Sequence, residues 1–270
     1  MAYDAFMAPR AMAPISIFMT RPGNIARKAY SLLLQAGNTG QPLSSSGPSD
    51  QAALQKMRDD WNRRAAENAQ HFVQTERAEW QDREFFRSGE INAAELIMTD
   101  MPRICGPGRS PLDLHMLEIG CGVGRMTRML ARIFGQVTAL DISDEMVARA
   151  RENTADLSNV TVLLGDGATL RPLASNTLDF VFSFIVFQHI PSLDIIASYC
   201  REASRVLKPG GLFKFHVQGR TTFRRGKRDT WTGYQVSPSQ ARMLARRAGF
   251  VMEQAEGRGT QYYWLWFRKP

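Results

Sequence analysis

The run of residues 117–125 constrains the fold of this chain more than any other part of its sequence. Three glycines, Gly120, Gly122 and Gly124, stand at alternate positions directly after a short apolar run that contains Glu118. A helical pattern of apolar residues follows them. Glycine tolerates backbone conformations and close approaches that a Cβ atom prevents. The run therefore predicts a strand, a tight turn and a helix, a unit that brings backbone N–H groups close to a nucleotide-like ligand.

The charges in this run narrow the choice of ligand. A dinucleotide-binding turn has the pattern G-x-G-x-x-G, but Arg125 stands where the last glycine of that pattern belongs. Glu118 would repel a pyrophosphate, whereas it would attract the ammonium group of an amino acid. The run therefore favours a ligand with a cationic amino acid end. The alternative is a tight turn that binds no ligand.

Acids also end the next two strand patterns. Asp141 ends the second apolar run, about 20 residues after the first glycine, where an acid can accept hydrogen bonds from ribose hydroxyls. Asp166 ends the third run and is placed to accept from an adenine amino group, with Gly167 and Ala168 leaving room for the ring. Because the carboxyl ends of parallel strands meet at one edge of a sheet, we expect these acids to converge with Glu118.

Strand patterns alternate with helical patterns along the second half of the chain. A fourth apolar run occupies residues 177–187, and a turn at 208–211 leads into a fifth run at 212–217. Such alternation predicts a parallel sheet with helices on both faces. Residues 250–256 and 261–267 then predict a closing hairpin.

Residues 112–270 together resemble the class I S-adenosylmethionine-dependent methyltransferases. The resemblance rests on the glycine run, on the acids after the second and third strands, and on the Leu-Lys-Pro-Gly-Gly turn before the fifth strand. It implies an α/β fold with a Rossmann-like, seven-stranded, mostly parallel sheet whose last strand is antiparallel. It also implies S-adenosyl-L-methionine as cofactor, but it leaves the methyl acceptor open because one fold hosts many chemistries.

The resemblance also implies which residues contact the cofactor. Glu118 and the glycine run would face its methionine part, Asp141 would hold the ribose, and Asp166 would bind the adenine. The candidate cofactor-binding residues are Glu118, Gly120, Cys121, Gly122, Gly124, Asp141, Ile142, Asp166, Gly167, Ala168, Ser183 and Phe184.

His189 is the candidate catalytic base. It follows the fourth strand, near the expected position of the transferred methyl group, and a neutral imidazole can take a proton from a phenol or an acid near pH 7. The alternative is a histidine that only packs or hydrogen-bonds locally. His216 on the fifth strand is a second candidate, for which a structural role in the sheet is the default.

A basic segment follows the fifth strand. Residues 219–229 contain five cations and one acid, and aromatic residues lie among and just after them. The segment is either a solvated loop or a clamp for an acidic or aromatic acceptor. The candidate acceptor-binding residues are Arg224, Arg225, Trp231 and Tyr234.

The chain before the first strand divides into two parts. Residues 1–49 contain Met-Ala-Pro repeats, further prolines and a serine cluster, which predict a weakly ordered extension. Residues 50–111 contain two helical patterns, which by resemblance to small-molecule methyltransferases form a lid over the cofactor and the acceptor. Trp61 in the first pattern is expected to pack in the core. Residues 112–270 form the cofactor-binding domain.

Composition narrows the compartment and the partners that we expect for the protein. The chain has 270 residues with 44% hydrophobic content, enough for a sizeable core, and a formal net charge of +8. No apolar run approaches the length of a membrane span, and the three cysteines lack metal-ligand spacing. We therefore expect a cytoplasmic protein with neither a metal site nor a membrane partner.

These features predict an enzyme that transfers a methyl group from S-adenosylmethionine to oxygen or nitrogen of a small molecule. Two alternatives remain open. The net charge and the basic segment would suit an RNA methyltransferase, in which Arg224 and Arg225 bind phosphates. A protein that holds the cofactor without turnover would have a regulatory role instead.

Overall fold

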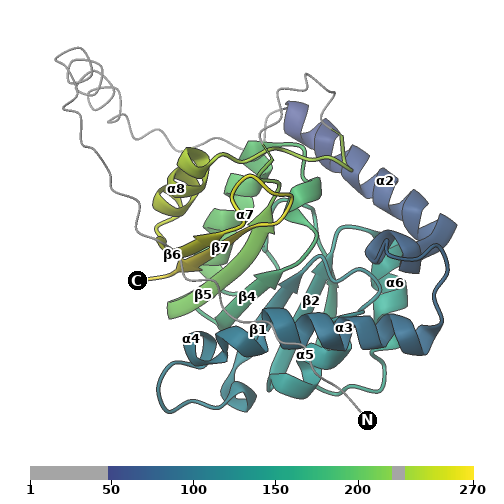
Figure 1. The fold of residues 1–270 in the computed structure, drawn as a ribbon, viewed down its shortest axis with the longest axis horizontal. Coiled ribbons are helices and arrows are strands. Elements are labelled where there is room, and N and C mark those ends of the chain that lie inside the picture. Colours follow the sequence, from purple (N-terminus) through teal and green to yellow (C-terminus); the bar gives the residue numbers. More distant parts are fainter. Residues whose placement is uncertain (1–47, 221–228) are drawn as a thin grey trace, which may run out of the picture. The chain divides into compact units, whose positions relative to one another are not determined.

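The computed structural model describes residues 48–220 and 229–270. The acceptor candidates Arg224 and Arg225 lie outside these residues, as does nearly all of the predicted N-terminal extension. In the described part, seven strands form one sheet in the order β3-β2-β1-β4-β5-β7-β6 (Figure 1). None of the described helices is both long enough and apolar enough to span a membrane.

The sheet is mostly parallel, as the resemblance implies. Its strands are β1 (His115–Ile119), β2 (Gln136–Asp141), β3 (Val160–Leu164), β4 (Leu178–Ser183), β5 (Leu207–Val217), β6 (Val251–Glu256) and β7 (Tyr263–Arg268). Strands β1 to β5 pair in parallel, and β7 runs antiparallel to both β5 and β6. The predicted sheet and its antiparallel last strand are therefore confirmed.

Two strand boundaries differ from the sequence prediction. The fourth strand ends at Ser183, before the end of the predicted run, because the backbone turns at Ile185, whose φ is +57°. The fifth strand begins at Leu207, so the predicted turn at 208–211 lies within its first residues. The pairing of β5 with β4 shifts register there.

Helices cover both faces of the sheet. They are α2 (Pro48–Val73), α3 (Asp82–Leu96), α4 (Met101–Cys105), α5 (Thr127–Ile133), α6 (Asp144–Asn153), α7 (Leu193–Val206) and α8 (Pro238–Arg247), with three short 3₁₀ turns, η1 (Met98–Asp100), η2 (Pro111–Asp113) and η3 (Phe187–His189). Helices α3, α5 and α6 pack on one face, and α7 and α8 pack on the other (Figure 1).

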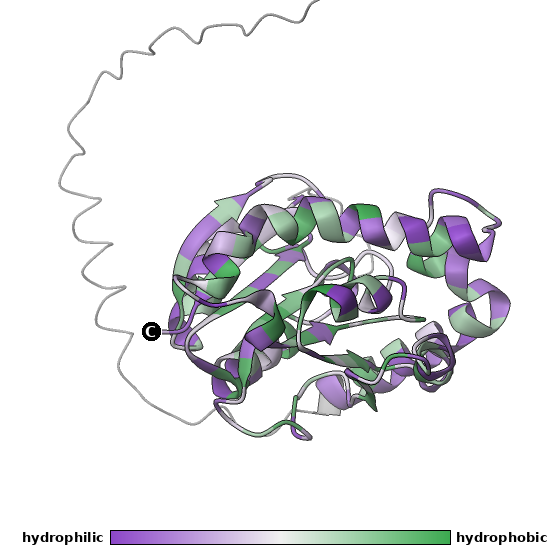
Figure 2. Cartoon of the chain, turned by 90° about the horizontal axis from the view of Figure 1, so that it is seen from below, coloured by the Kyte–Doolittle hydropathy of each residue, from purple (hydrophilic) through white to green (hydrophobic). Residues whose placement is uncertain are grey.

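The core follows from the pleat of the central strands. On β5, Phe213 and Phe215 pack with α7 and α8, whereas Leu212 packs on the opposite face with α5. Figure 2 shows hydrophobic residues gathered on the central strands, while the helices carry hydrophobic and hydrophilic residues on different sides. The sheet is thus buried on both faces, as is typical of mostly parallel sheets.

A lysine is buried in the sheet. Lys214 on β5 is 3% exposed, and its Nζ donates a hydrogen bond to Asp100 Oδ2 at 2.6 Å. Trp266 Nε1 donates to the same oxygen, and Lys214 also donates to the carbonyl of Leu96. The pair therefore ties the segment that follows α3 to the sheet.

The substitution Lys214→Met should lower the free energy of unfolding by about 3 kcal/mol, because it breaks a buried ion pair and leaves Asp100 with Arg103 as its one described cationic partner. The control Arg132→Met breaks an ion pair with Glu90 whose side chains are 60% and 46% exposed. It should cost less than about 1 kcal/mol. Urea unfolding followed by circular dichroism measures both losses, and equal losses would contradict this role of the buried pair.

Candidate active site

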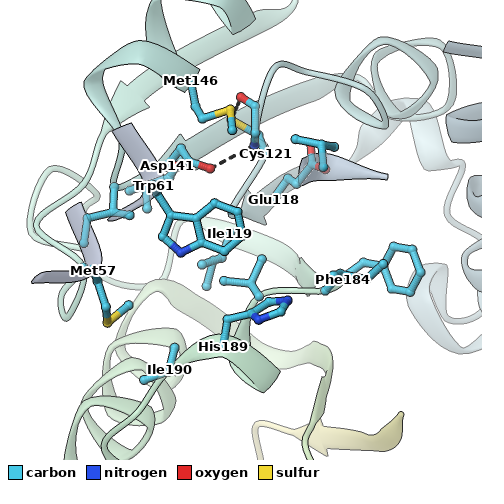
Figure 3. Close-up of a pocket in the computed structure, with 18 of the residues that line it drawn as sticks. Met57, Trp61, Glu118, Ile119, Cys121, Asp141, Met146, Phe184, His189 and Ile190 are labelled. Carbon is cyan, nitrogen blue, oxygen red and sulfur yellow. Dashed lines mark hydrogen bonds between the residues drawn. The ribbon is translucent and has the colours of Figure 1, made fainter. Parts of the chain in front are cut away.

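A cavity of about 870 Å³, part of it open to solvent, lies at the carboxyl ends of β1 and β2. Its walls come from these strand ends, the glycine turn, the segment after β4 and α2 (Figure 3). The strand order of the sheet reverses between β1 and β4, and open α/β sheets bind ligands at such a point. The predicted site residues that line the cavity are Glu118, Gly120, Cys121, Gly122, Asp141, Ile142, Gly167, Phe184 and His189.

The glycine run forms the predicted tight turn. Gly120 has φ +77°, and a Cβ atom there would overlap the side chain of Val186. Its N–H donates to the carbonyl of Leu140 at 2.6 Å. Gly122 has φ +54°, and its N–H donates to Asp141 Oδ2 at 2.9 Å. The N–H of Cys121 also donates to the carbonyl of Leu140, so three backbone N–H groups fasten the turn to the end of β2.

Asp141 is a buried carboxylate whose oxygens can accept further hydrogen bonds. Its Oδ2 accepts from Gly122, and its Oδ1 accepts from the N–H of Ser143 at 2.9 Å. Burial raises the pKa of Asp141, and these N–H donors lower it. Each carboxylate oxygen accepts more than one hydrogen bond, so both can still accept from hydroxyl groups of a ligand.

Glu118 is the second buried carboxylate of the cavity. It is 5% exposed, and Thr127 Oγ1 donates to its Oε2 at 2.6 Å. Burial raises the pKa of Glu118 to about 7, although Thr127 and the nearby Arg125 lower it. In the described part of the chain no donor contacts the other carboxylate oxygen. Glu118 therefore lies close to its midpoint of ionisation at neutral pH, and a ligand cation would favour its ionised form.

The acid after the third strand does not line the cavity, contrary to expectation. Asp166 is exposed, and its Oδ1 accepts from the N–H groups of Ala168 and Thr169 at 2.9 and 2.6 Å. Its other oxygen accepts from the Thr169 hydroxyl. The carboxylate is therefore folded back on its own turn. Ala168 packs in the core beside α2 and also lies outside the cavity wall.

Two further candidates have local structural roles. Gly124 lies against α6, where a Cβ atom would approach Thr154 to 3.4 Å, and it does not line the cavity. Ser183 is buried at the end of β4, and its Oγ donates to the carbonyl of Ile119 at 2.9 Å. This bond holds the end of β4 next to the end of β1.

His189 lines the cavity, but both of its ring nitrogens are engaged. Nδ1 lies 2.6 Å from the carbonyl oxygen of Trp231, an acceptor, so Nδ1 carries the proton. Nε2 lies 3.1 Å from Gln188 Nε2 and accepts from it. Burial lowers the pKa of His189 to about 4. The expected role as a base is therefore not favoured, because the free lone pair is occupied and the cationic form is disfavoured.

The described acceptor candidates lie beside the cavity. Trp231 is 43% exposed and is not part of the wall, although its ring contacts the rings of Phe72 and His189. Tyr234 is half-buried, and its hydroxyl accepts from Gln240 Nε2 at 2.9 Å, against the start of α8. The prediction that they bind an acceptor thus has no direct support from their positions.

Comparisons with known proteins agree with this geometry. Residues 117–215 match the model of the methyltransferase domain family. Over 114 residues the chain is 33% identical to malonyl-[acyl-carrier protein] O-methyltransferase of Methylococcus capsulatus, covering 42% of this chain and 40% of that protein. Over 102 residues it is 34% identical to demethylmenaquinone methyltransferase of Staphylococcus aureus, covering 37% and 41%. The chain thus spans about two fifths of the length of these curated relatives.

A solved structure extends the similarity to the whole sheet. A DhpI–SAH complex superposes with a TM-score of 0.55 at 21% identity, covering 80% of this chain and 97% of that one. Such a likeness shows the fold. Residues 117–215 belong to the class I S-adenosylmethionine-dependent methyltransferase family. The glycine turn and both buried acids of the cavity lie within this methyltransferase domain.

The sequence analysis expected helices of residues 50–111 to form a lid, but it did not identify which residues of α2 line the cavity. They are Met57, Trp61, Phe72 and Val73. Trp61 was expected to pack in the core, but it faces the cavity, with its ring 5.5 Å from that of His189 (Figure 3). Helical spacing marks both core and cavity residues, so no signal in the pattern separates the two. The kink at Asn68, which divides α2, has no sequence signature either.

Arg125 is another wall residue of the methyltransferase domain that was not predicted. The sequence pattern marks it only as the residue that replaces a glycine. Val186 and Ile185, which follow β4, also line the cavity.

The substitution Glu118→Gln should stabilise the ligand-free protein above pH 7. The folded state holds the proton of Glu118 up to about pH 7, whereas the unfolded chain releases it near pH 4.5, so stability falls as pH rises through this window. Removing the ionisable group should gain roughly 2 kcal/mol at pH 8 and little at pH 4.5. Thermal unfolding at several pH values measures the gain.

The exposed Glu90→Gln is the control, and it should change stability by less than about 0.5 kcal/mol at every pH. A gain for Glu118→Gln that does not depend on pH would contradict the raised pKa.

Proposed function

We propose that the protein transfers the methyl group of S-adenosyl-L-methionine to oxygen or nitrogen of a small-molecule acceptor. The observation that carries this proposal is the convergence of Asp141 and Glu118 on one cavity, on either side of the glycine turn. The methyltransferase domain and the names of the two relatives support it.

The described residues fit this cofactor. Asp141 keeps lone pairs for ribose hydroxyls, and Glu118 offers a carboxylate to the ammonium group. Gly167 has φ +86°, and a Cβ atom there would overlap Ile142, so both residues favour a flat slot for the adenine ring. With Asp166 folded away, this slot is apolar.

When bound, the sulfonium cofactor supplies the reactive carbon and the leaving group. The chain has to align the acceptor and exclude water. Trp61 and Phe72 on α2 form an apolar cover, which supports the role of this helix as a lid.

The segment after β4 forms the opposite wall. Ile185 has φ +57°, a conformation that costs a β-branched residue energy, and its N–H donates to His216 Nε2 at 2.7 Å. His216, the second histidine candidate, is buried and has its pKa lowered by burial to about 3. We assign it the positioning of this wall.

The wall also informs the choice of acceptor. Trp61, Phe72 and Phe184 give it aromatic surfaces, which suit an aromatic or apolar molecule. The predictions of an acidic acceptor and of RNA depended on Arg224 and Arg225, which lie outside the described residues. A small acceptor agrees with the names of the curated relatives, one of which acts on demethylmenaquinone.

Isothermal titration with S-adenosylhomocysteine tests the cofactor site. Asp141→Asn should weaken binding by at least about tenfold, because charge-assisted hydrogen bonds to the ribose are lost. The control Asp156→Asn changes an exposed acid that pairs with Arg128, and it should leave the affinity unchanged. The absence of binding to the native protein at millimolar ligand would refute the proposal.

Turnover distinguishes an enzyme from a regulatory protein. Phenols, carboxylic acids, amines and RNA are each incubated with S-adenosylmethionine, and the demethylated product is measured. Product from a small molecule is the expected result. Cofactor binding without product from any acceptor would favour regulation, and product from RNA alone, with steep dependence on salt, would favour the RNA alternative.

The substitution His189→Gln should keep kcat within about fivefold, since a base with both nitrogens engaged and a pKa of about 4 contributes little proton transfer. KM for the acceptor should change more, because the ring lies against Trp61 in the wall. His115→Gln, at the other end of β1, is the control. A fall of kcat by a factor of about 100 or more would instead restore His189 as the general base.

A further inference from the structure

A second cavity lies at the amino ends of β4 and β5, opposite the active site. It has a volume of about 530 Å³, part of it open to solvent, and α4 and the loop after α4 complete its walls (Figure 1). The turn at 208–211, to which the proposed function assigns no role, belongs to this wall. The basic residues that line the second cavity are Arg103, Arg109, Lys208 and Arg268, and Asp179 is the one acid among the described lining residues. The second cavity is therefore predominantly cationic.

The acid of the second cavity is shared by two cations. Asp179 is 4% exposed, and its Oδ1 accepts from Arg109 Nη2 at 2.6 Å. Its Oδ2 accepts from Lys208 Nζ at 2.9 Å and from the N–H of His115 at 3.0 Å. Burial raises the pKa of Asp179, but these donors lower it below its ordinary value, so the carboxylate is ionised at neutral pH. Its single negative charge balances only one of the two cations that bind it.

The neighbouring ion pairs repeat this imbalance. Glu253 binds Arg268 Nε at 2.8 Å and lies 3.7 Å from Arg103 Nε. Asp100 binds both Arg103 and the buried Lys214. In the ion pairs of the described residues around the second cavity, five cations therefore share three carboxylates. Two positive charges remain unbalanced, and a surplus of this kind beside a cavity attracts an anion.

The two cations on Asp179 keep further hydrogen-bond donors. Among the described residues Arg109 donates only through Nη2, which leaves the N–H groups of Nε and Nη1 for a ligand. Lys208 donates only one of its three N–H bonds to them. Gly106 and Gly210 also line the second cavity, and no atom of the described chain lies within 4 Å of where a Cβ atom would stand at either. The wall there is bare backbone, which a ligand can approach closely.

These features match a phosphate group better than a carboxylate. Near pH 8 a phosphate monoester carries about two negative charges, as many as the ion pairs leave unbalanced, and it offers three acceptor oxygens. The donors of Arg109 and Lys208 come from two different segments, the loop after α4 and β5. A tetrahedral anion can accept from donors in several directions, whereas a carboxylate has two oxygens in one plane and a single charge.

We propose that the second cavity binds a doubly charged phosphate group through Arg109 and Lys208. Asp179 positions both side chains, and Arg103 and Arg268 add positive potential. No described residue lines both cavities, so this site is separate from that of the cofactor and does not depend on the proposed function. A bound phosphate ties the loop after α4 to β5 and thereby stabilises the folded chain.

Thermal unfolding of the full chain at pH 8 tests this site with two probes, inorganic phosphate and phenyl phosphate. At about 20 mM, at least one of them should raise Tm by about 5 °C over sodium chloride of the same ionic strength, as expected for a Kd on the order of 1 mM. Sodium acetate at that ionic strength should give no such rise. A larger rise with phenyl phosphate would identify a monoester as the ligand, and a larger rise with inorganic phosphate would identify the free ion.

Two variants remove the proposed ligands one at a time. Arg109→Gln and Lys208→Gln should each reduce the rise to less than about 2 °C, while Asp179 keeps its other cation in each and the fold is retained. The control Arg132→Gln changes an exposed arginine that pairs with Glu90 outside the second cavity, and it should keep the full rise. Arg125→Gln, in the wall of the first cavity, should keep it as well.

Four results would overturn the inference. Neither phosphate probe raises Tm above its value in chloride, so that salt only screens charges. Acetate raises it as much as phosphate, so that any anion suffices. Arg109→Gln and Lys208→Gln both keep the full rise, so that phosphate binds elsewhere. The rise is lost in Arg125→Gln, which would place the phosphate in the first cavity.

Discussion

The site depends on the hydrogen bond from the N–H of Gly122 to the carboxylate of Asp141. It joins the turn after β1 to the end of β2, and these strands already pair in register, with Ile119 opposite Leu140. The bond can form only because Gly122 adopts φ +54°. It fixes the separation between the acid on β2 and the acid on β1, and so sets the length of a ligand that contacts both.

The sequence was sufficient to predict the sheet and the positions of Glu118 and Asp141. Both follow from the pattern of residues along each strand. An acid at the end of a buried parallel strand points to the shared edge, as Glu118 and Asp141 do. Asp166 follows the same pattern on the edge strand β3, yet its carboxylate is captured by the N–H groups of Ala168 and Thr169. With the Thr169 hydroxyl, three local donors bind the Asp166 carboxylate, one more than Asp141 accepts, and the pattern of apolar residues does not predict these bonds.

Contacts between distant segments determine the features of the site that the sequence did not predict. The position of His189 after β4 was predicted, but its protonation depends on the carbonyl of Trp231, which the chain places beside it from another segment. Likewise, Trp61 and Phe72 have the spacing of core residues, and only the packing of α2 across the sheet edge turns them toward the cavity. The periodicity of apolar residues predicts which face of a helix is buried. It does not predict what lies against that face, because that depends on the tertiary fold.

Gly89 on α3 packs directly against the backbone carbonyl of Arg125, so the cavity depends on a helix outside the matched residues. Residues 117–215 carry the family pattern, but transplanting them into another chain would leave the arginine without Ser88 and Asn92. Helix α3 therefore supplies, from outside the matched residues, the contacts that hold this cavity arginine. Substitutions in α3 can therefore change how firmly Arg125 is positioned while the sheet stays the same.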